Sequence, residues 1–203
     1  MAGRGRPRAF DRDTALRRAM EVFWKQGYEA TSMTDLTSAM GIASPSLYAA
    51  FGCKEALFRE AVTLYDATEG AHMAHALTEL PTAKGAVEAV LRYNARAYAD
   101  EGTPHGCMVV LAATNCSPAN APVQEHLATW RQAGVDQMAR RLERAVNEGE
   151  LPAATDTEAM AVFYTTVIHG MSLRARDGST RAELDKTVDR AMAAWDAVAA
   201  PAP

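Results

Sequence analysis

The chain has 203 residues, of which 48% are hydrophobic and 23% are charged, a composition typical of a globular protein with a substantial core. Thirteen glycines and nine prolines exclude collagen-like and low-complexity chains, and three cysteines, an odd number, argue against a disulfide-stapled secreted scaffold. The formal net charge of −4 excludes a protein that coats nucleic acid over its whole surface, but it allows a local basic patch.

Charge is distributed unevenly along the chain. Residues 1–18 contain six arginines against two aspartates, whereas residues 61–203 contain twelve basic and eighteen acidic residues. This asymmetry predicts a polyanion-binding end on an acidic body, with a solvated tail that binds nothing as the alternative. The arginine-rich start is not followed by an apolar segment, and the longest apolar stretches, such as 108–113, are far shorter than a membrane-spanning helix. We therefore expect a cytoplasmic protein with no membrane partner.

Apolar residues recur at helical spacing almost everywhere, and no alternation typical of β-strands is bounded by turn signals. Glycine and proline breaks divide the chain into about nine helices. Three short helices fall within 12–51, a helix from about 54 follows, a long helix ends at 147–149, and the last two helices span about 156–176 and 181–199. The sequence predicts an all-α fold, with a three-helix domain over 1–56 and a larger helical domain over 57–203.

The most informative stretch is 31–54. Ser32 and Asp35 have the spacing of a capping box, which begins a helix, and Gly41 supplies the positive φ that ends it. Ser44 is expected to cap a second helix, with Pro45 at its first position. Two short helices joined by such a turn form a helix-turn-helix, for which a plain corner between two helices is the alternative.

The second of these helices exposes small side chains, which allow its N-terminal end to approach the bases in a major groove. These residues are Ser44, Pro45, Ser46, Ala49 and Ala50. Tyr48 and Lys54 are placed to reach phosphates, and Lys54 also begins the next helix, where free N–H groups attract an anion.

The stretch 23–58 resembles the DNA-binding domain of the TetR-family transcriptional regulators. The resemblance rests on Gly27-Tyr28-Glu29-Ala30-Thr31-Ser32, Asp35-Leu36, Met40-Gly41-Ile42, Ser46-Leu47-Tyr48, Phe51 and Lys54-Glu55-Ala56-Leu57-Phe58. It implies a homodimer, usually a repressor, that binds a palindromic double-stranded DNA operator and releases it when a small-molecule effector occupies the C-terminal domain. It also implies that Thr34, Ser44, Pro45 and Ser46 lie near base edges and that Thr31, Ser32, Tyr48 and Lys54 lie near phosphates.

Two positions depart from the family pattern. Ala50 replaces a polar or aromatic residue often found beside the tyrosine, and Cys53 occupies a position where a better capping residue is usual. At the N-terminus, the segment 3–8 resembles the core of an AT-hook, so Arg4 and Arg6 are expected to enter a minor groove. A tail that adds only nonspecific charge is the alternative.

The resemblance requires a ligand pocket and a dimer face in the second domain. Aromatic residues and methionine suit an apolar or flat ligand, and a few polar side chains would orient it. The candidate pocket residues are Tyr65, Tyr93, Asn94, Met108, Asn115, Trp130, Phe163 and His169. The apolar stripes of the last two helices are assigned to a four-helix dimer bundle through Met160, Val167, Gly170, Leu184, Val188, Ala191 and Trp195. For both sets, ordinary intramolecular core is the alternative.

Other chemistry is weakly supported. Glu69, His72 and His75 share a helix face but are better explained as an exposed polar face, so no metal and no cofactor are predicted. Cys53 lies at a helix N-terminus beside Lys54, a position that activates thiols, so a redox-sensing regulator is an alternative function. The sequence contains none of the common catalytic motifs, which makes a helical enzyme less favoured. A protein-docking module is the third possibility.

Overall fold

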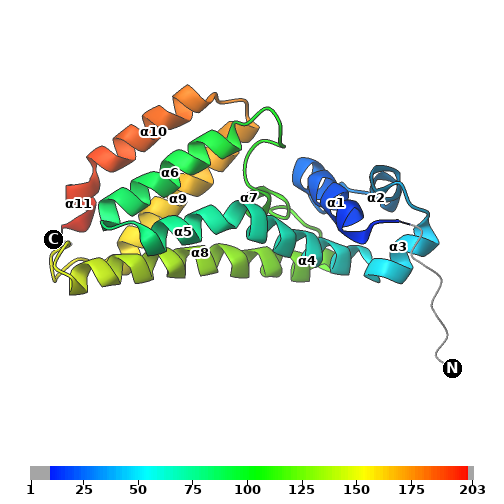
Figure 1. Cartoon of the computed structure of the whole chain (residues 1–203), viewed down its shortest axis with the longest axis horizontal. Helices are drawn as coiled ribbons and strands as arrows, with labels where there is room; N and C mark the ends of the chain where they lie inside the picture. The colour runs from blue at the N-terminus through cyan, green and yellow to red at the C-terminus, as the bar shows by residue number, and fades with distance from the viewer. Residues whose placement is uncertain (1–9, 201–203) are drawn as a thin grey trace.

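The computed structural model describes residues 10–200, which are helical with no β-strand among them (Figure 1). The α-helices are α1 (Arg12–Gln26), α2 (Met33–Met40), α3 (Ser44–Phe51), α4 (Lys54–Tyr65), α5 (Ala71–Glu79), α6 (Ala83–Tyr98), α7 (Met108–Leu111), α8 (Ala121–Asn147), α9 (Thr157–Arg176), α10 (Arg181–Ala193) and α11 (Trp195–Ala199). A π-helical turn, η1 (Asp66–Gly70), joins α4 to α5, and a 3-10 turn, η2 (Pro118–Asn120), precedes α8. The predicted all-α fold is confirmed.

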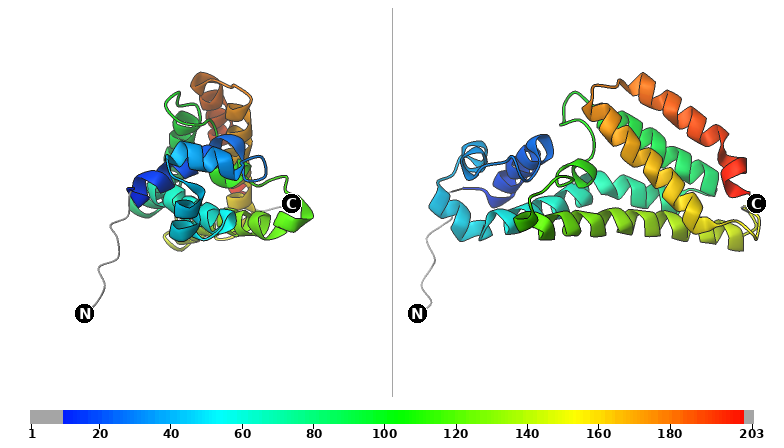
Figure 2. Two further views of the ribbon diagram at one scale, coloured as in Figure 1. Left: turned by 90° about the vertical axis from the view of Figure 1, so that its right-hand side faces the viewer. Right: turned by 180° about the vertical axis from the view of Figure 1, so that it is seen from behind.

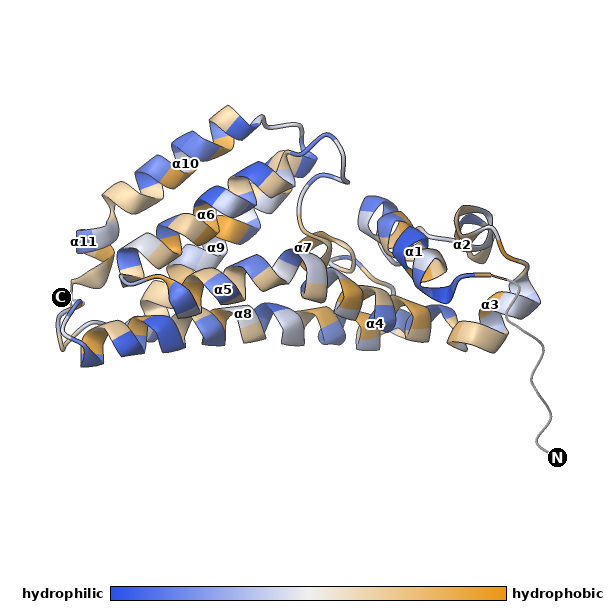
Figure 3. Ribbon diagram, viewed as in Figure 1, coloured by the Kyte–Doolittle hydropathy of each residue, from blue (hydrophilic) through white to orange (hydrophobic). Residues whose placement is uncertain are grey.

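The first three helices form a small head at one end of the molecule, while α6, α9 and α10 form a body at the other end (Figure 1 and Figure 2). The helices α4 and α5 follow one another along the length of the molecule, and α8 runs beside them. Figure 3 shows hydrophobic and hydrophilic residues interleaved along the longer helices. This pattern is expected of helices that bury one face and expose the other.

Local sequence signals explain the turns of the head. The Ser32 hydroxyl accepts a hydrogen bond from the Asp35 N–H at 3.0 Å, while the Asp35 carboxylate accepts from the Ser32 N–H at 2.8 Å, so the predicted capping box is confirmed. Gly41 adopts a φ of +68° and ends α2. The prediction that Ser44 is the N-cap of α3 is wrong by one residue. Ala43 occupies the cap position without a side-chain hydrogen bond, and Ser44 is already inside the helix.

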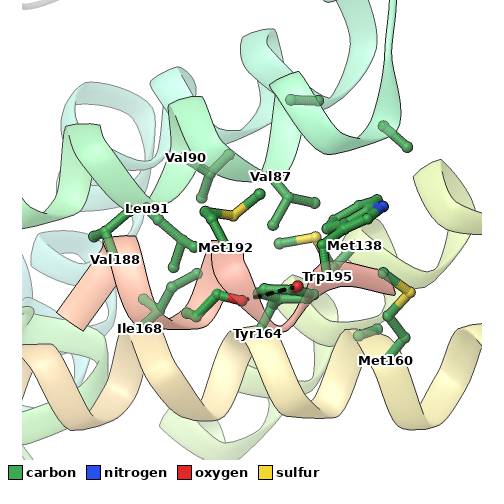
Figure 4. Close-up of a cluster of buried hydrophobic side chains, with 14 of the residues drawn as sticks. Val87, Val90, Leu91, Met138, Met160, Tyr164, Ile168, Val188, Met192 and Trp195 are labelled. Carbon is green, nitrogen blue, oxygen red and sulfur yellow. Dashed lines mark hydrogen bonds between the residues drawn. The ribbon is translucent and has the colours of Figure 1, made fainter. Parts of the chain in front are cut away.

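Two hydrophobic clusters hold the structure together. The first contains the inward faces of α1 to α4, including Phe23, Leu36 and Leu47, and it extends to α7 and the start of α8. The second fills the body between α6, α8, α9 and α10, as the close-up in Figure 4 shows. There the Tyr164 hydroxyl donates to the Ala191 carbonyl at 3.3 Å. The head therefore shares its core with α7 and α8, which follow it by more than forty residues in the sequence.

Most residues assigned to the dimer face lie inside this second cluster. The buried ones are Met160, Leu184, Val188, Ala191 and Trp195. Figure 4 shows three of these, Met160, Val188 and Trp195, among the core side chains. Their apolar spacing reflects packing within one chain, so the structure contradicts their assignment to a face between two chains. Val167 is half-buried and Gly170 is exposed on α9.

The helix boundaries follow the predictions closely, with two differences. The predicted helix over about 156–176 is observed as α9, capped by the Asp156 carboxylate. The predicted helix over 181–199 is broken at Ala194 into α10 and α11. This break and the division of the helix predicted from about 54 into α4 and α5 by η1 bring the structure to more than the expected nine helices. Ala194 carries no glycine or proline signal that would reveal the break between α10 and α11.

Arg176, near the end of α9, holds the head against the body. Its guanidinium donates to the carbonyl oxygens of Trp24 at 2.9 Å and His105 at 3.1 Å. The Trp24 carbonyl belongs to the last turn of α1, where a cation also interacts favourably with the helix dipole. A second contact between head and body is the hydrogen bond from the Trp24 indole N–H to the Gly106 carbonyl, at 2.9 Å.

We expect Arg176→Ala to lower the free energy of unfolding by about 1 kcal/mol, because the variant loses these hydrogen bonds to carbonyl groups. Thermal unfolding and hydrogen exchange of the last turn of α1 measure the effect. Arg174→Ala, an exposed neighbour on the same helix, is the control. Equal stability and equal exchange in the two variants would show that Arg176 does not hold the head.

Candidate nucleic-acid interface and ligand cavity

The outer surface of α3 is the candidate surface for DNA. Leu47 and Phe51 point into the head core and are buried, whereas Ser44, Pro45 and Tyr48 are exposed on the other side of the helix. The Tyr48 side chain is 51% exposed, the only large aromatic side chain of the described head to be so open. Small side chains therefore surround one protruding tyrosine, which suits a helix that enters a major groove.

The predicted contacts nearby fall into two groups. Thr34 is exposed on α2, and Ser46 is half-buried on α3, so both remain accessible. Thr31, in contrast, is 1% exposed, and its hydroxyl donates to the Gly27 carbonyl at 2.6 Å. The Thr31 side chain therefore stabilises the turn after α1, which contradicts its assignment as a phosphate contact. The Ser32 hydroxyl is engaged in the capping box but lies at the surface.

Lys54 lies at the start of α4 with its ammonium group 4.4 Å from the centre of the Tyr28 ring. Partial burial lowers the pKa of Lys54, while the carboxylates of Glu29 and Asp35 oppose that effect. Stacking on Tyr28 holds the cation beside the free N–H groups of α4, where a phosphate would meet both. Arg4 and Arg6 of the arm lie outside the described residues.

Arg12 fixes the position of α3 within the head. Its guanidinium donates to the Glu60 carboxylate at 2.7 Å and to the Ala50 carbonyl at 3.3 Å, and it lies 4.3 Å from the centre of the Phe51 ring. One arginine of α1 therefore joins the C-terminal end of α3 to α4. This contact had no recognisable signal in the sequence, because Arg12 and Glu60 are 48 positions apart.

The three cysteines are free. Cys53 is exposed, and its sulfur accepts a hydrogen bond from the Ala56 N–H at 3.4 Å, so it does cap α4 as the sequence position implies. Cys107 lies deeper, near the Tyr65 and Tyr98 hydroxyls, and burial raises the pKa of its thiol. The redox alternative therefore rests on Cys53, which is exposed and lies at the N-terminus of α4 beside Lys54.

A cavity of about 350 Å³ lies between the head and the body. Its walls come from α1, α4, η1, α5, α6, α7, α8 and α9. Five of the eight predicted pocket residues line it: Tyr65, Tyr93, Asn94, Trp130 and His169. This volume and the aromatic lining are typical of a site for a small organic molecule.

The other three predicted pocket residues do not line this cavity. Met108 is fully buried in the first hydrophobic cluster, Asn115 is exposed after α7, and Phe163 points outward from α9. The sequence also missed several lining residues, among them Trp24, Asp66, Tyr98 and Arg131. Trp24 comes from the head and reaches the cavity because α1 ends against residues 106–112, a long-range contact that helical periodicity cannot reveal.

Aromatic and acidic groups interact on one wall of the cavity. The Tyr93 hydroxyl donates to the Glu69 carboxylate at 3.3 Å, and the Tyr93 ring stacks on His72 with 4.1 Å between ring centres. Burial, together with the neighbouring Glu69, raises the pKa of Tyr93 to about 12. These contacts account for two of the three residues considered for a metal site. Within residues 10–200, no group of three or more potential ligands could hold a metal ion.

The folded structure disfavours the protonated form of His169 on α9. Burial lowers the pKa of its imidazole below the ordinary value of 6.5, and the nearby Arg131 charge lowers it further. The unfolded chain therefore binds this proton more readily, so the contribution of His169 to stability is present above pH 6.5 and is lost as the pH falls below that value and through the lower pKa of the folded state.

We expect the melting temperature of the protein to fall on acidification from about pH 7.5 to 5.5, and His169→Gln to reduce that fall. Thermal unfolding at several pH values measures it. His75→Gln, which changes an exposed histidine of α5, should leave the pH profile unchanged. A profile for His169→Gln identical to that of the unmodified protein would contradict this account.

None of the helices over residues 10–200 is long and apolar enough to cross a lipid bilayer.

Comparisons with known proteins agree with this arrangement. The family model described as bacterial regulatory proteins, tetR family, matches residues 15–61, and the model described as tetracyclin repressor-like, C-terminal domain, matches residues 83–195. The chain is 34% identical to the HTH-type transcriptional repressor ComR of Escherichia coli, over 95% of this chain and 92% of that protein. It is 32% identical to the repressor BdcR of the same organism, over 90% and 88% of the two chains.

A solved structure is also similar. A cysteine mutant of the TetR family transcriptional regulator CifR, complexed with 26-bp double-strand operator DNA, superposes with a TM-score of 0.92. The two sequences are 45% identical, and the match covers 94% of this chain and all of the other. These relatives are transcriptional regulators and not enzymes, in agreement with the lack of catalytic motifs. The chain belongs to the TetR family of DNA-binding transcriptional regulators.

Proposed function

We propose that this chain is a homodimeric repressor that binds a palindromic operator through two copies of α3 and is released when a small molecule occupies the cavity. The observation that carries the proposal is Trp24, which belongs to the head and also lines the cavity. A ligand that displaces its indole would disturb the contact with Gly106 that positions the head. We further propose that residues 1–56 act as the DNA-binding domain and 57–203 as the ligand-binding and dimerisation domain.

A dimer face is supported by α9. Val162, Phe163 and Leu173 are 47%, 37% and 53% exposed, and all three lie on this helix. Apart from Tyr48, they are the exposed large hydrophobic side chains within residues 10–200. A concentrated apolar surface on one helix favours association with a second protein surface. We propose that the α9 helices of two chains pack together there, with Gly170 allowing close approach.

Dimerisation would set the spacing of the two heads. Two copies of α3 must be about 34 Å apart to enter successive major grooves on one side of the DNA. A ligand that favours another spacing lowers the affinity for the operator by shifting the population of conformations. The cavity lies between the head and the helices of the body, so a ligand bound there could change the position of the head relative to the body.

The test begins with the DNA upstream of the gene that encodes the chain. A mobility-shift assay with that DNA is expected to give a specific complex, which a scrambled duplex of the same composition does not give. A thermal-shift screen against metabolites and antimicrobials then identifies compounds that stabilise the protein. Compounds that raise the melting temperature are expected to release the DNA. Stabilising compounds that all leave the complex intact would contradict the release step.

Contacts on α3 can be separated by their effect on sequence preference. Tyr48→Phe removes only a hydroxyl and is expected to weaken binding to every duplex by about fivefold, the equivalent of about 1 kcal/mol. Ser46→Ala is expected to change the preferred base at one position instead. Binding to a set of single-base operator variants measures both. A base-specific effect of Tyr48→Phe would contradict its assignment to a phosphate.

A further inference from the structure

The charged groups that line the cavity are separated by sign. Asp66 and Glu69 lie on η1, whereas Arg131 and Arg140 lie on α8. Over residues 10–200, none of these four side chains forms an ion pair, although two other arginines of α8, Arg141 and Arg144, pair with Glu150 and Glu148. The cavity therefore holds two carboxylates and two guanidinium groups that do not neutralise one another.

Asp66 is the more available of the two carboxylates. Glu69 accepts the Tyr93 hydroxyl, but Asp66 has no hydrogen-bond partner among the side chains described here. Burial raises the pKa of the Asp66 carboxyl, with no charged neighbour to offset it. The rings of Tyr65 and Trp130 share the cavity with this carboxylate. A cationic group of a ligand would meet both a carboxylate and aromatic faces there.

Arg131 is the corresponding group on α8. Its guanidinium donates to the Val109 carbonyl at 2.9 Å, which orients the side chain but supplies no negative charge. Burial lowers the pKa of Arg131, as expected for a cation without an acidic partner. His169 lies close enough for the Arg131 charge to act on it. An anionic group of a ligand would therefore meet a guanidinium and a neutral imidazole.

We infer that the effector is a small amphoteric molecule, with an anionic group bound by Arg131 and a cationic group bound by Asp66, joined by a flat apolar part between the aromatic walls. A ligand with a single charge would be attracted at one end and would meet a like charge at the other. A ligand with both charges gains from both partners, neither of which is in an ion pair within residues 10–200. This inference rests on the proposed function, since it names the chemistry of the proposed effector.

The test uses four probes built on one ring: 4-(aminomethyl)benzoate, 4-methylbenzoate, 4-methylbenzylamine and p-cresol. Trp24 and Trp130 line the cavity, so tryptophan fluorescence and calorimetry report binding to the full-length protein without DNA. We expect 4-(aminomethyl)benzoate to bind about tenfold or more tightly than each singly charged probe. Equal or tighter binding of either singly charged probe, or no binding of the amphoteric one, would overturn the inference.

Two variants test which residue binds the cationic group of the ligand and which binds its anionic group. Asp66→Asn is expected to weaken the amine-bearing probes about tenfold and to leave the affinity for 4-methylbenzoate equal or higher, because a like charge is removed, whereas Arg131→Gln should weaken the carboxylate-bearing probes instead. Arg131→Lys, which keeps the charge, should restore part of the affinity. Glu125→Gln, on the exposed surface of α8, is the control. An equal loss for all four probes would show that these residues serve only the fold and would overturn the assignment.

The same probes separate this inference from the function that it extends. If 4-(aminomethyl)benzoate binds with the expected preference but leaves the DNA complex intact, the release step fails while the chemistry of the site stands. If some other class of compound releases the DNA and competes with none of the probes, the repressor function stands and the inference about ligand charge is overturned.

Discussion

Leu47→Ala is expected to lower the free energy of unfolding by about 2–5 kcal/mol and to remove specific DNA binding. Leu47 is fully buried and belongs to the cluster that joins α1, α2, α3 and α4. α3 has only eight residues, too few for a helix to be stable by itself, so its position depends on Leu47 and Phe51. Removing three carbons from Leu47 leaves a cavity beneath the surface that approaches DNA.

Chemical denaturation and operator binding measure the two effects of Leu47→Ala. The control is Ala49→Ser, which changes an exposed position on the same helix and is expected to alter stability by no more than about 0.5 kcal/mol. If Leu47→Ala retained both the stability and the operator affinity of the unmodified protein, α3 would not depend on its buried anchors, and the account of the head would be wrong.

Because the proposed dimer packs through α9, Phe163→Asp is expected to give a monomer and to lower affinity for a palindromic operator by more than about 100-fold. The substitution places a carboxylate on the exposed apolar surface of α9, where a second chain would bury it without a partner. Two heads that are no longer connected must bind their half-sites independently, so the gain from effective concentration is lost.

Light scattering of the purified protein at micromolar concentration measures the oligomeric state, and circular dichroism verifies that the variant is folded. Leu173→Asp, at the other exposed end of the apolar surface of α9, should act in the same direction. Ala128→Asp, on an exposed part of α8, adds the same charge elsewhere and should remain a dimer. Dimers that persist in both α9 variants would place the interface on another surface.

Local signals made the head predictable. The capping box at Ser32 and the glycine at 41 act over a few residues, so the sequence alone locates the turn and the two helices around it. Thr31 shows the limit of this reasoning. Its position matched the family pattern, but whether its hydroxyl faces solvent or the Gly27 carbonyl depends on how the turn folds back on α1.

The body was less predictable because its important contacts join distant segments. The stripe that includes Leu184, Val188 and Trp195 has the spacing of a helix that packs on another helix, but spacing does not reveal whether that helix belongs to the same chain. Five of the seven dimer residues were therefore misassigned, and the exposed apolar side chains of α9 were not recognised. The charged lining of the cavity was missed for the same reason, because Asp66 and Arg131 are distant in the sequence and line the same cavity only in the folded chain.

We propose that two chains bind one operator through paired heads. Fluorescence anisotropy of a labelled duplex from the upstream DNA, titrated with the full-length protein at physiological salt, measures both the number of chains bound and their affinity. We expect an even number of chains on each operator duplex and an affinity about a thousandfold or more above that for a scrambled duplex. One chain per duplex, or equal affinity for the two duplexes, would contradict it.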